Sequence, residues 1–386
     1  MPRTSLSASF FALTTAVGLC STPASAQQQR AYSSGHQKSP IPLRAYCSPP
    51  GAMTLEGSFF TIPLAFNLHV AEYTLAAQWE THFLDRGAGY FAPAIGAPAG
   101  PLPSGGVAFN YNGRLIRWDP GVGITFMNNQ SPNPSGASPW PYNPTDTACG
   151  DSIMIVGNDG KLYARDVAGT NAWTNWGNFG TPFVGKPGLV EHLFTGETHA
   201  AVVEQFGRLW IIDDVCGLNG APTWILAGWG GPNAGLPGGD PLAFCTSVGA
   251  GLNGGKFYVT ADYWTGAPTD LYEAGPDLGV WGWYNHGHPS WSSGFLSEPT
   301  AARDAVLILT QNAATGRVEL AYLHYANGSW QPWINLGSPV GDTIVPDTIT
   351  SEQWANRIVV KGTSGKFWMC RNDGSGWFWY DLDTPM

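Results

Sequence analysis

Short apolar stretches alternate with turn residues along most of the chain, and one combination of them recurs. Six times a Gly is followed by Lys or Arg and then by an apolar, strand-forming stretch, at Gly113, Gly160, Gly207, Gly255, Gly316 and Gly365. The intervals between these glycines are 47, 47, 48, 61 and 49 residues. Counting back 47 residues from Gly113 reaches Phe66, and residues 67–73 (NLHVAEY) form a degenerate seventh copy. A fixed period of this length is typical of repeat proteins.

A second marker runs in phase with the first. An aromatic stretch follows each copy, at residues 78–80, 124–126, 172–177, 223–225, 280–283, 329–333 and 376–379. An apolar run such as 152–156 or 305–309 precedes most of the glycines, and a further short segment such as 189–194 precedes that run. Each unit therefore predicts four short strands joined by tight turns, of which Asn158-Asp159-Gly160 is an example.

Seven units of this kind predict an all-β fold, a seven-bladed β-propeller of four-stranded antiparallel blades. One small four-stranded sheet cannot bury both of its faces, whereas seven sheets arranged radially bury them against their neighbours, with aromatic side chains between the blades. An open solenoid would require polar capping repeats, and the sequence pattern shows none. We therefore predict a propeller over residues 49–386.

The N-terminal residues have the pattern of an export signal. Arg3 precedes a largely apolar stretch at 10–19, and Ala24-Ser25-Ala26 has the small-x-small form of a cleavage site. We expect a signal peptide at 1–26, a flexible leader at 27–48 and a secreted, extracellular protein. The apolar run is shorter than the roughly 20 residues that a membrane helix requires, and no later stretch approaches that length. We therefore expect no membrane insertion.

The amino-acid composition and net charge argue against disorder and against one class of binding partner. The chain has 50 Gly and 31 Pro residues, which supply turns for many short strands, and its 18 Trp and 14 Tyr residues argue against disorder. The net charge is −10, and no basic stripe is available to neutralise phosphates, which argues against a nucleic-acid partner.

Five cysteines remain after signal removal: Cys47, Cys149, Cys216, Cys245 and Cys370. None has a zinc-like spacing, and an exported protein meets oxidising conditions. We expect two disulfides and one buried thiol, with the connectivity open; one hypothesis is a Cys47–Cys370 bond that fastens the ends of the propeller. His286-Gly287-His288 lacks a third ligand and no acidic calcium loop is present, so we expect neither a metal nor a cofactor.

The repeat resembles that of tectonin-like and bacterial seven-bladed propeller lectins. The resemblance rests on an Asp/Asn-Gly turn, a Lys/Arg-Leu-Tyr strand, a Trp-x-x-Trp segment and a following Leu/Phe-Gly. The best copies are residues 158–180 (NDGKLYAR followed by WTNWGNFG) and 316–337 (GRVEL followed by WQPWINLG). It covers nearly the whole mature chain as a pattern, and two or three blades match closely. Residues 124–126 lack the Trp-x-x-Trp.

The resemblance implies carbohydrate binding. A sugar site needs an aromatic face for the apolar side of a pyranose and a few fixed polar groups for its hydroxyls. The candidate aromatic residues are Trp173, Trp176, Trp330 and Trp333. Residues three apart on a strand point to opposite faces, so in each pair we expect one ring between blades and the other at the rim. Arg165, Arg208 and Arg317 are hydroxyl donors by resemblance alone; the alternative is that they are ordinary strand-surface charges.

Two other classes of function stay open. Sialidases and several polysaccharide lyases are propellers, but hydrolysis of a glycosidic bond requires paired carboxylates. Acidic residues such as Glu204, Asp213 and Glu273 are scattered, and no Gly-x-Ser-x-Gly occurs. The sequence therefore favours a non-catalytic protein whose partners are glycans or a secreted or cell-surface glycoprotein, with protein binding and an enzyme as the alternatives.

Overall fold

Every element in the described part of the structure is a β-strand. The computed structural model describes residues 59–61, 68–74, 78–85, 107–111, 114–119, 122–126, 140–142, 152–157, 159–166, 173–178, 180–191, 198–204, 208–213, 215, 223–226, 243–250, 256–263, 270–277, 280–302, 304–346, 348–351 and 355–384. The signal peptide and leader predicted for 1–26 and 27–48 lie outside these residues, and both stay predictions. No helix among the described residues is long and apolar enough to cross a membrane.

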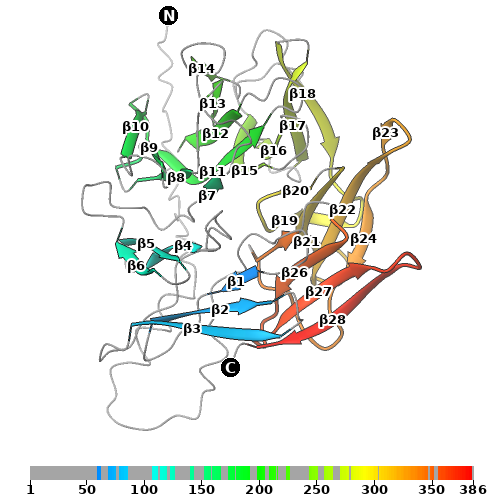
Figure 1. The fold of residues 1–386 in the computed structure, drawn as a ribbon. Helices are drawn as coiled ribbons and strands as arrows, with labels where there is room; N and C mark the ends of the chain where they lie inside the picture. Colours follow the sequence, from blue (N-terminus) through cyan, green and yellow to red (C-terminus); the bar gives the residue numbers. More distant parts are fainter. Residues whose placement is uncertain are drawn as a thin grey trace, which may run out of the picture. The chain divides into compact units, whose positions relative to one another are not determined.

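The described strands form seven antiparallel sheets, numbered here in chain order (Figure 1). Sheet one contains β1 (Phe59–Thr61), β2 (Leu68–Tyr73) and β3 (Trp79–Asp85). Sheet two contains β4 (Val107–Tyr111), β5 (Arg114–Asp119) and β6 (Gly123–Phe126). Sheet three contains β7 (Trp140–Tyr142), β8 (Ser152–Val156), β9 (Leu162–Asp166) and β10 (Trp173–Gly177).

Sheets four, five and seven follow the same four-stranded meander, whereas sheet six has six strands. Sheet four contains β11 (Phe183–Glu191), β12 (Thr198–Glu204), β13 (Leu209–Asp213) and β14 (Thr223–Leu226). Sheet five contains β15 (Ala243–Ala250), β16 (Phe257–Tyr263), β17 (Asp270–Asp277) and β18 (Val280–Gly287). Sheet six contains β19 (Ser292–Phe295), β20 (Thr300–Ala302), β21 (Ala305–Asn312), β22 (Val318–Ala326), β23 (Ser329–Trp330) and β24 (Ile334–Gly337). Sheet seven contains β25 (Thr350–Ser351), β26 (Arg357–Lys361), β27 (Phe367–Asn372) and β28 (Trp377–Asp383).

This architecture confirms the all-β propeller fold, and seven described sheets are consistent with the seven predicted blades. In sheets three, four, six and seven the Gly-Lys/Arg strand is the third strand, and the preceding apolar run is the second, as expected. The prediction was wrong in sheet five. There the strand after Gly255 is β16, the second strand, and β17 lies between it and the aromatic strand β18.

A β-bulge in the last strand fixes the register of four sheets. The side-chain oxygen of Asn175, Asn285, Asn335 or Asp381 accepts the N–H of the residue two further on. That second residue has a left-handed φ of 76°, 64°, 70° or 62°, and it is Gly in three sheets and Asp383 in the fourth. It pairs with a fully buried residue of the third strand, which is Leu162, Leu271, Leu320 or Phe367. The shared pattern is Trp-x-Asn/Asp-x-Gly/Asp, at 173–177, 283–287, 333–337 and 379–383.

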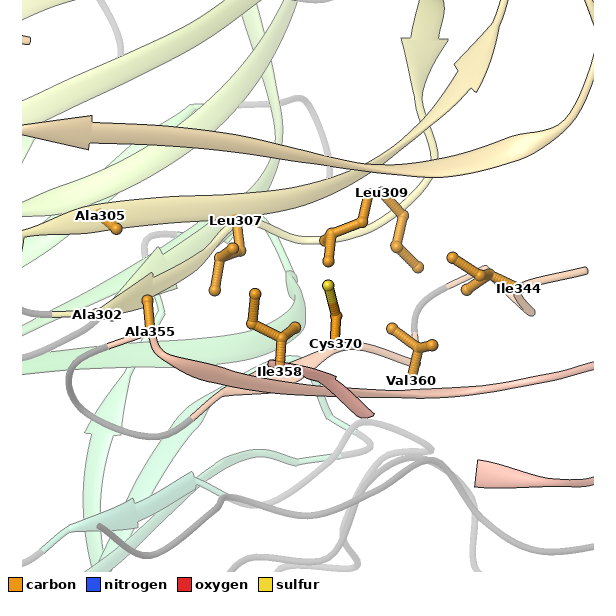
Figure 2. Packing of buried hydrophobic residues seen from close by; sticks show 10 residues of the cluster. Ala302, Ala305, Leu307, Leu309, Ile344, Ala355, Ile358, Val360 and Cys370 are labelled. Atoms are coloured by element: carbon orange, nitrogen blue, oxygen red, sulfur yellow. The ribbon is translucent and has the colours of Figure 1, made fainter. Parts of the chain in front are cut away.

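The core is divided among the contacts between consecutive sheets. Figure 2 shows one such contact, where Leu307 and Leu309 of sheet six point toward Ile358 and Val360 of sheet seven. Cys370 lies in this cluster as a buried free thiol, and burial raises its pKa to about 12. The Cys47–Cys370 bond is therefore wrong. Side chains of the other five cysteines lie outside the described residues.

Among the described residues, the first and last sheets are joined by apolar packing and a hydrogen bond. Phe59 and Tyr73 of sheet one share a buried cluster with Val359 and Phe367 of sheet seven. The indole nitrogen of Trp79 also donates to the backbone oxygen of Leu382, 2.8 Å away. Joining the ends offsets the chain entropy that ring closure costs, and here apolar packing and one hydrogen bond provide the joint.

Candidate functional site

The two tryptophans of the pair 330 and 333 have different environments. The last strand of sheet six is interrupted at residues 331–333, between β23 and β24, where Pro332 has no N–H for the ladder. Strand alternation therefore does not relate Trp330 to Trp333, contrary to the expectation from the sequence.

Trp333 packs between sheets five and six. Its indole nitrogen donates to the backbone oxygen of His286, 3.2 Å away in β18. Its ring lies 6.1 Å from the ring of Phe295, and it packs against the buried cluster that contains Leu271 and Val306. Trp379 makes the equivalent bond to Leu336 at 3.0 Å. Trp333 therefore belongs to a repeated contact between neighbouring sheets.

Trp330 packs against the same buried cluster, with its ring 6.1 Å from that of Tyr258, and it also belongs to a row of aromatic rings that reaches solvent. Its ring centroid lies 5.5 Å from Tyr325, its cross-strand partner, and 4.7 Å from His286. His286 in turn lies 4.7 Å from Tyr284. Tyr284 is 57% exposed and Tyr325 is 45% exposed, whereas Trp330 is half-buried. We call these four residues the aromatic platform.

Local structure explains why both ends of the platform are fixed. Asn327 and Gly328, with φ of 53° and 79°, form the tight turn between β22 and β23 that places Tyr325 opposite Trp330. Asn-Gly is the preferred sequence for a hairpin turn with two left-handed residues. In sheet five, Tyr284 pairs with Glu273, and the bulge at Asn285 follows directly.

A buried carboxylate lies beneath the platform. Glu273 Oε2 is 3.0 Å from His286 Nε2, and Glu273 Oε1 bonds the Lys256 ammonium. The Lys256 stem crosses Gly275, where a Cβ would lie 3.0 Å from the Lys256 Cγ. Burial of Glu273 raises the pKa of its carboxyl, but the hydrogen bonds from His286 and Lys256 outweigh that effect and lower the pKa overall. The carboxylate therefore keeps its negative charge at this place.

The two histidines of the His-Gly-His segment face different carboxylates. His286 bonds Glu273, whereas His288 Nδ1 is 2.7 Å from Asp270 Oδ1. Within the described ranges, no group of three or more His, Cys, Asp or Glu side chains could hold a metal ion. This finding covers only that part of the chain.

The remaining predicted site residues lie at other places. Trp176 packs in a cluster shared by sheets three and four, with its indole nitrogen buried and without a hydrogen-bond partner. Arg208 forms an ion pair with Glu204, and Arg317 donates to the backbone oxygens of Pro339 and Asp342, both at 3.3 Å. Trp173 and Arg165 are paired positions of β10 and β9, but their side chains lie outside the described residues. Carbohydrate binding by any of these residues stays a prediction.

Sequence reasoning missed three platform residues: Tyr284, His286 and Tyr325. Tyr284 and His286 occupy the two variable positions of the Trp-x-Asn-x-Gly pattern at 283–287, so that pattern was the available signal. Tyr325 stands two residues before the Asn-Gly turn. No local pattern links it to sheet five, because their proximity arises only from the packing of the two sheets.

Comparison with known proteins shows the fold. No model of a known family matches the chain, and no curated protein matches it. A puromycin hydrolase structure matches with a TM-score of 0.54 at 13% identity, covering 90% of this chain and 56% of that one. The WD40 domain of SCAP from fission yeast matches with 0.51 at 9% identity, covering 88% and 87%. The RRP9 WD40 repeats match with 0.52 at 9% identity, covering 85% and 88%.

These similarities define the class as a β-propeller. The chain spans 56% of the length of the puromycin hydrolase that it matches. At these identities the similarity concerns fold alone, and propellers carry many unrelated functions. The function must therefore be argued from the platform.

Proposed function

We propose that the protein is an exported, non-catalytic carbohydrate-binding propeller and that the aromatic platform is its binding site. The observation that carries this proposal is the row of contacting rings in which Tyr284 and Tyr325 are exposed on either side of Trp330. Aromatic side chains offer a large apolar face at the surface, which matches the C–H face of a pyranose.

Polar groups beside the platform suit sugar hydroxyls. The Lys256 side chain is 40% exposed, and its ammonium forms an ion pair with the Glu273 carboxylate. Asn327 and Ser329 are exposed on the turn that joins the two strands carrying Tyr325 and Trp330. A few fixed donors and acceptors around an apolar surface are the usual composition of a small-ligand site.

The repeat supports the same proposal. The residue before the bulge Asn or Asp is Tyr284 in sheet five, Ile334 in sheet six and Tyr380 in sheet seven. Each is an exposed large apolar side chain. The repeat resemblance to tectonin-like lectins also points to sugar recognition at repeated positions. Tyr284 differs from the other two because His286 and Trp330 connect its ring to a second exposed ring, that of Tyr325.

A glycan array tests the proposal. The native protein is expected to bind at least one class of glycan, and the double variant Tyr284→Ala/Tyr325→Ala to lose that signal. Phe378→Ala removes an aromatic ring of β28 that is as exposed as Tyr325, and it serves as the control, with binding retained. Absence of binding by the native protein, or equal loss in the control, contradicts the proposal. Export is tested separately by the mass of the secreted chain, which is expected to begin near Gln27.

Protein binding is the second candidate, and one observation favours it. Phe378 and Tyr380 are both exposed and stand two residues apart on β28, hence on one face of that strand. An exposed apolar patch is typical of an interaction surface. If the array shows no glycan, pull-down with the native protein and with the double variant Phe378→Ala/Tyr380→Ala tests this alternative.

A further inference from the structure

The packing around His286 links the buried carboxylate to both halves of the platform. The His286 side chain is 1% exposed and contacts Tyr284 in its own strand and Trp330 in sheet six. Its Nε2 faces Glu273 Oε2 at 3.0 Å. The orientation of this imidazole therefore affects the rings on which a ligand would stack.

The charged and titratable groups that face His286, among the described residues, come from sheets five and six. Glu273 comes from β17, Lys256 from the residue before β16, and Tyr258 from β16, with ring centroids of Tyr258 and His286 6.2 Å apart. Tyr284 comes from β18 itself. Sheet six contributes the uncharged rings of Trp330 and Trp333, and Tyr325 lies beyond Trp330.

We propose that Glu273 is a positioning residue which, through His286, makes the affinity of the platform depend on pH; this inference rests on the proposed function. Neutral His286 donates from Nε2 to Glu273, which selects one tautomer and holds the ring edge against Trp330. Because Glu273 is ionised, this bond is already charge-assisted, and protonation of His286 adds an ion pair with the same carboxylate. The rings are therefore more firmly preorganised at lower pH, and binding becomes tighter.

Glycan affinity measured across pH is the first part of the test. The Glu273 carboxyl, with its lowered pKa, stays ionised between about pH 8 and about pH 5.5, so a pH dependence in this range does not come from Glu273. The affinity of the native protein is expected to rise about threefold from the higher to the lower pH. Glu273→Gln and His286→Gln are both expected to give a flat profile, because neither retains an ionisable imidazole bonded to a carboxylate.

Glu319→Gln is the matched control. Glu319 is a buried carboxylate in the neighbouring sheet, bonded by the side-chain amides of Asn312 at 2.8 Å and Asn335 at 2.7 Å. This variant removes a buried charge without altering His286, and it is expected to keep the native pH profile. Thermal melting of each variant shows that it is folded. A native profile that is flat, or that Glu273→Gln leaves unchanged, overturns the proposal.

A second readout does not require a ligand. Nitrogen chemical shifts of the His286 imidazole at about pH 8 report its tautomer. The native protein is expected to show the Nε2–H form, and Glu273→Gln a mixture, because an amide can act as donor or acceptor. If the native protein binds no glycan but the tautomer shifts, the proposed function fails and the positioning role stands. If the tautomer is unchanged in Glu273→Gln, the positioning role fails.

Discussion

The indole nitrogen of Trp79 and the backbone oxygen of Leu382 are 2.8 Å apart, although 303 residues separate them in the chain. Leu382 occupies the position in its bulge that Leu336 and His286 occupy in theirs, and those residues accept the indoles of Trp379 and Trp333. The hydrogen bond between the first and last sheets is thus of the same kind as those that join sheet five to sheet six and sheet six to sheet seven.

Replacing Trp79 by Phe is expected to lower the free energy of unfolding by about 1–2 kcal/mol, because one hydrogen bond is lost and a carbonyl is left without its donor. Urea unfolding measures this value. Trp379→Phe, at the equivalent bond between sheets six and seven, is expected to show a loss of similar size. Unchanged stability in Trp79→Phe would show that the indole bond does not help to close the structure.

The bulge residue offers a matched pair of substitutions. Gly337 has a φ of 70° and open space where a Cβ would stand, so Gly337→Ala is expected to cost about 1 kcal/mol through backbone strain alone. Asp383 has a φ of 62° at the equivalent position, and Asp383→Gly relieves the corresponding strain. The melting temperature is expected to fall in Gly337→Ala. In Asp383→Gly it is expected to rise or to stay unchanged. A destabilised Asp383→Gly protein would contradict the shared bulge.

The free thiol of Cys370 provides a chemical test of the packing in Figure 2. Burial raises its pKa to about 12, so at about pH 8 it is protonated and inaccessible. Iodoacetamide is expected to leave Cys370 unmodified in the native protein and to alkylate it after unfolding. A peptide map without reductant that links Cys370 to another cysteine would contradict the structure.

The lowered pKa of Glu273 predicts an acid-sensitive contribution to stability. A carboxyl with a depressed folded pKa stabilises the protein above its unfolded pKa, and this contribution is lost as the pH falls through the folded pKa. The loss is therefore expected below the ordinary value of 4.5. Melting temperatures recorded from neutral pH into that range should fall less steeply in Glu273→Gln than in the native protein. An identical slope would show that Glu273 is not paired as described.

The fold could be predicted from sequence because the 47-residue period repeats the turn signature together with the aromatic strand. The position of the strand after Gly255 within its sheet could not be predicted. A Gly-Lys turn indicates a hairpin, but the same turn can join the first and second strands or the second and third. Register depends on the bulge, where Gly287 pairs with Leu271. That pairing is visible only once the Trp-x-Asn-x-Gly pattern is recognised.

The candidate site could be predicted only in part. Trp330 stood out as an aromatic residue of a well-matched repeat. Its neighbours Tyr284 and His286 precede it by more than 40 residues and reach it through contacts between sheets. The division of roles between Trp330 and Trp333 depends on the break at Pro332, which removes the simple alternation of a continuous strand.

The pair Trp330 and Trp333 allows the central claim to be tested in one experiment, with glycan affinity and unfolding free energy measured on each single variant. Trp330→Ala is expected to weaken binding of a glycan identified on the array by about 1–3 kcal/mol, through loss of an aromatic face. Trp333→Phe is expected to lose about 1–2 kcal/mol of stability through its bond to His286, with affinity retained. If Trp330→Ala binds the glycan as tightly as the native protein does, the platform is not the binding site.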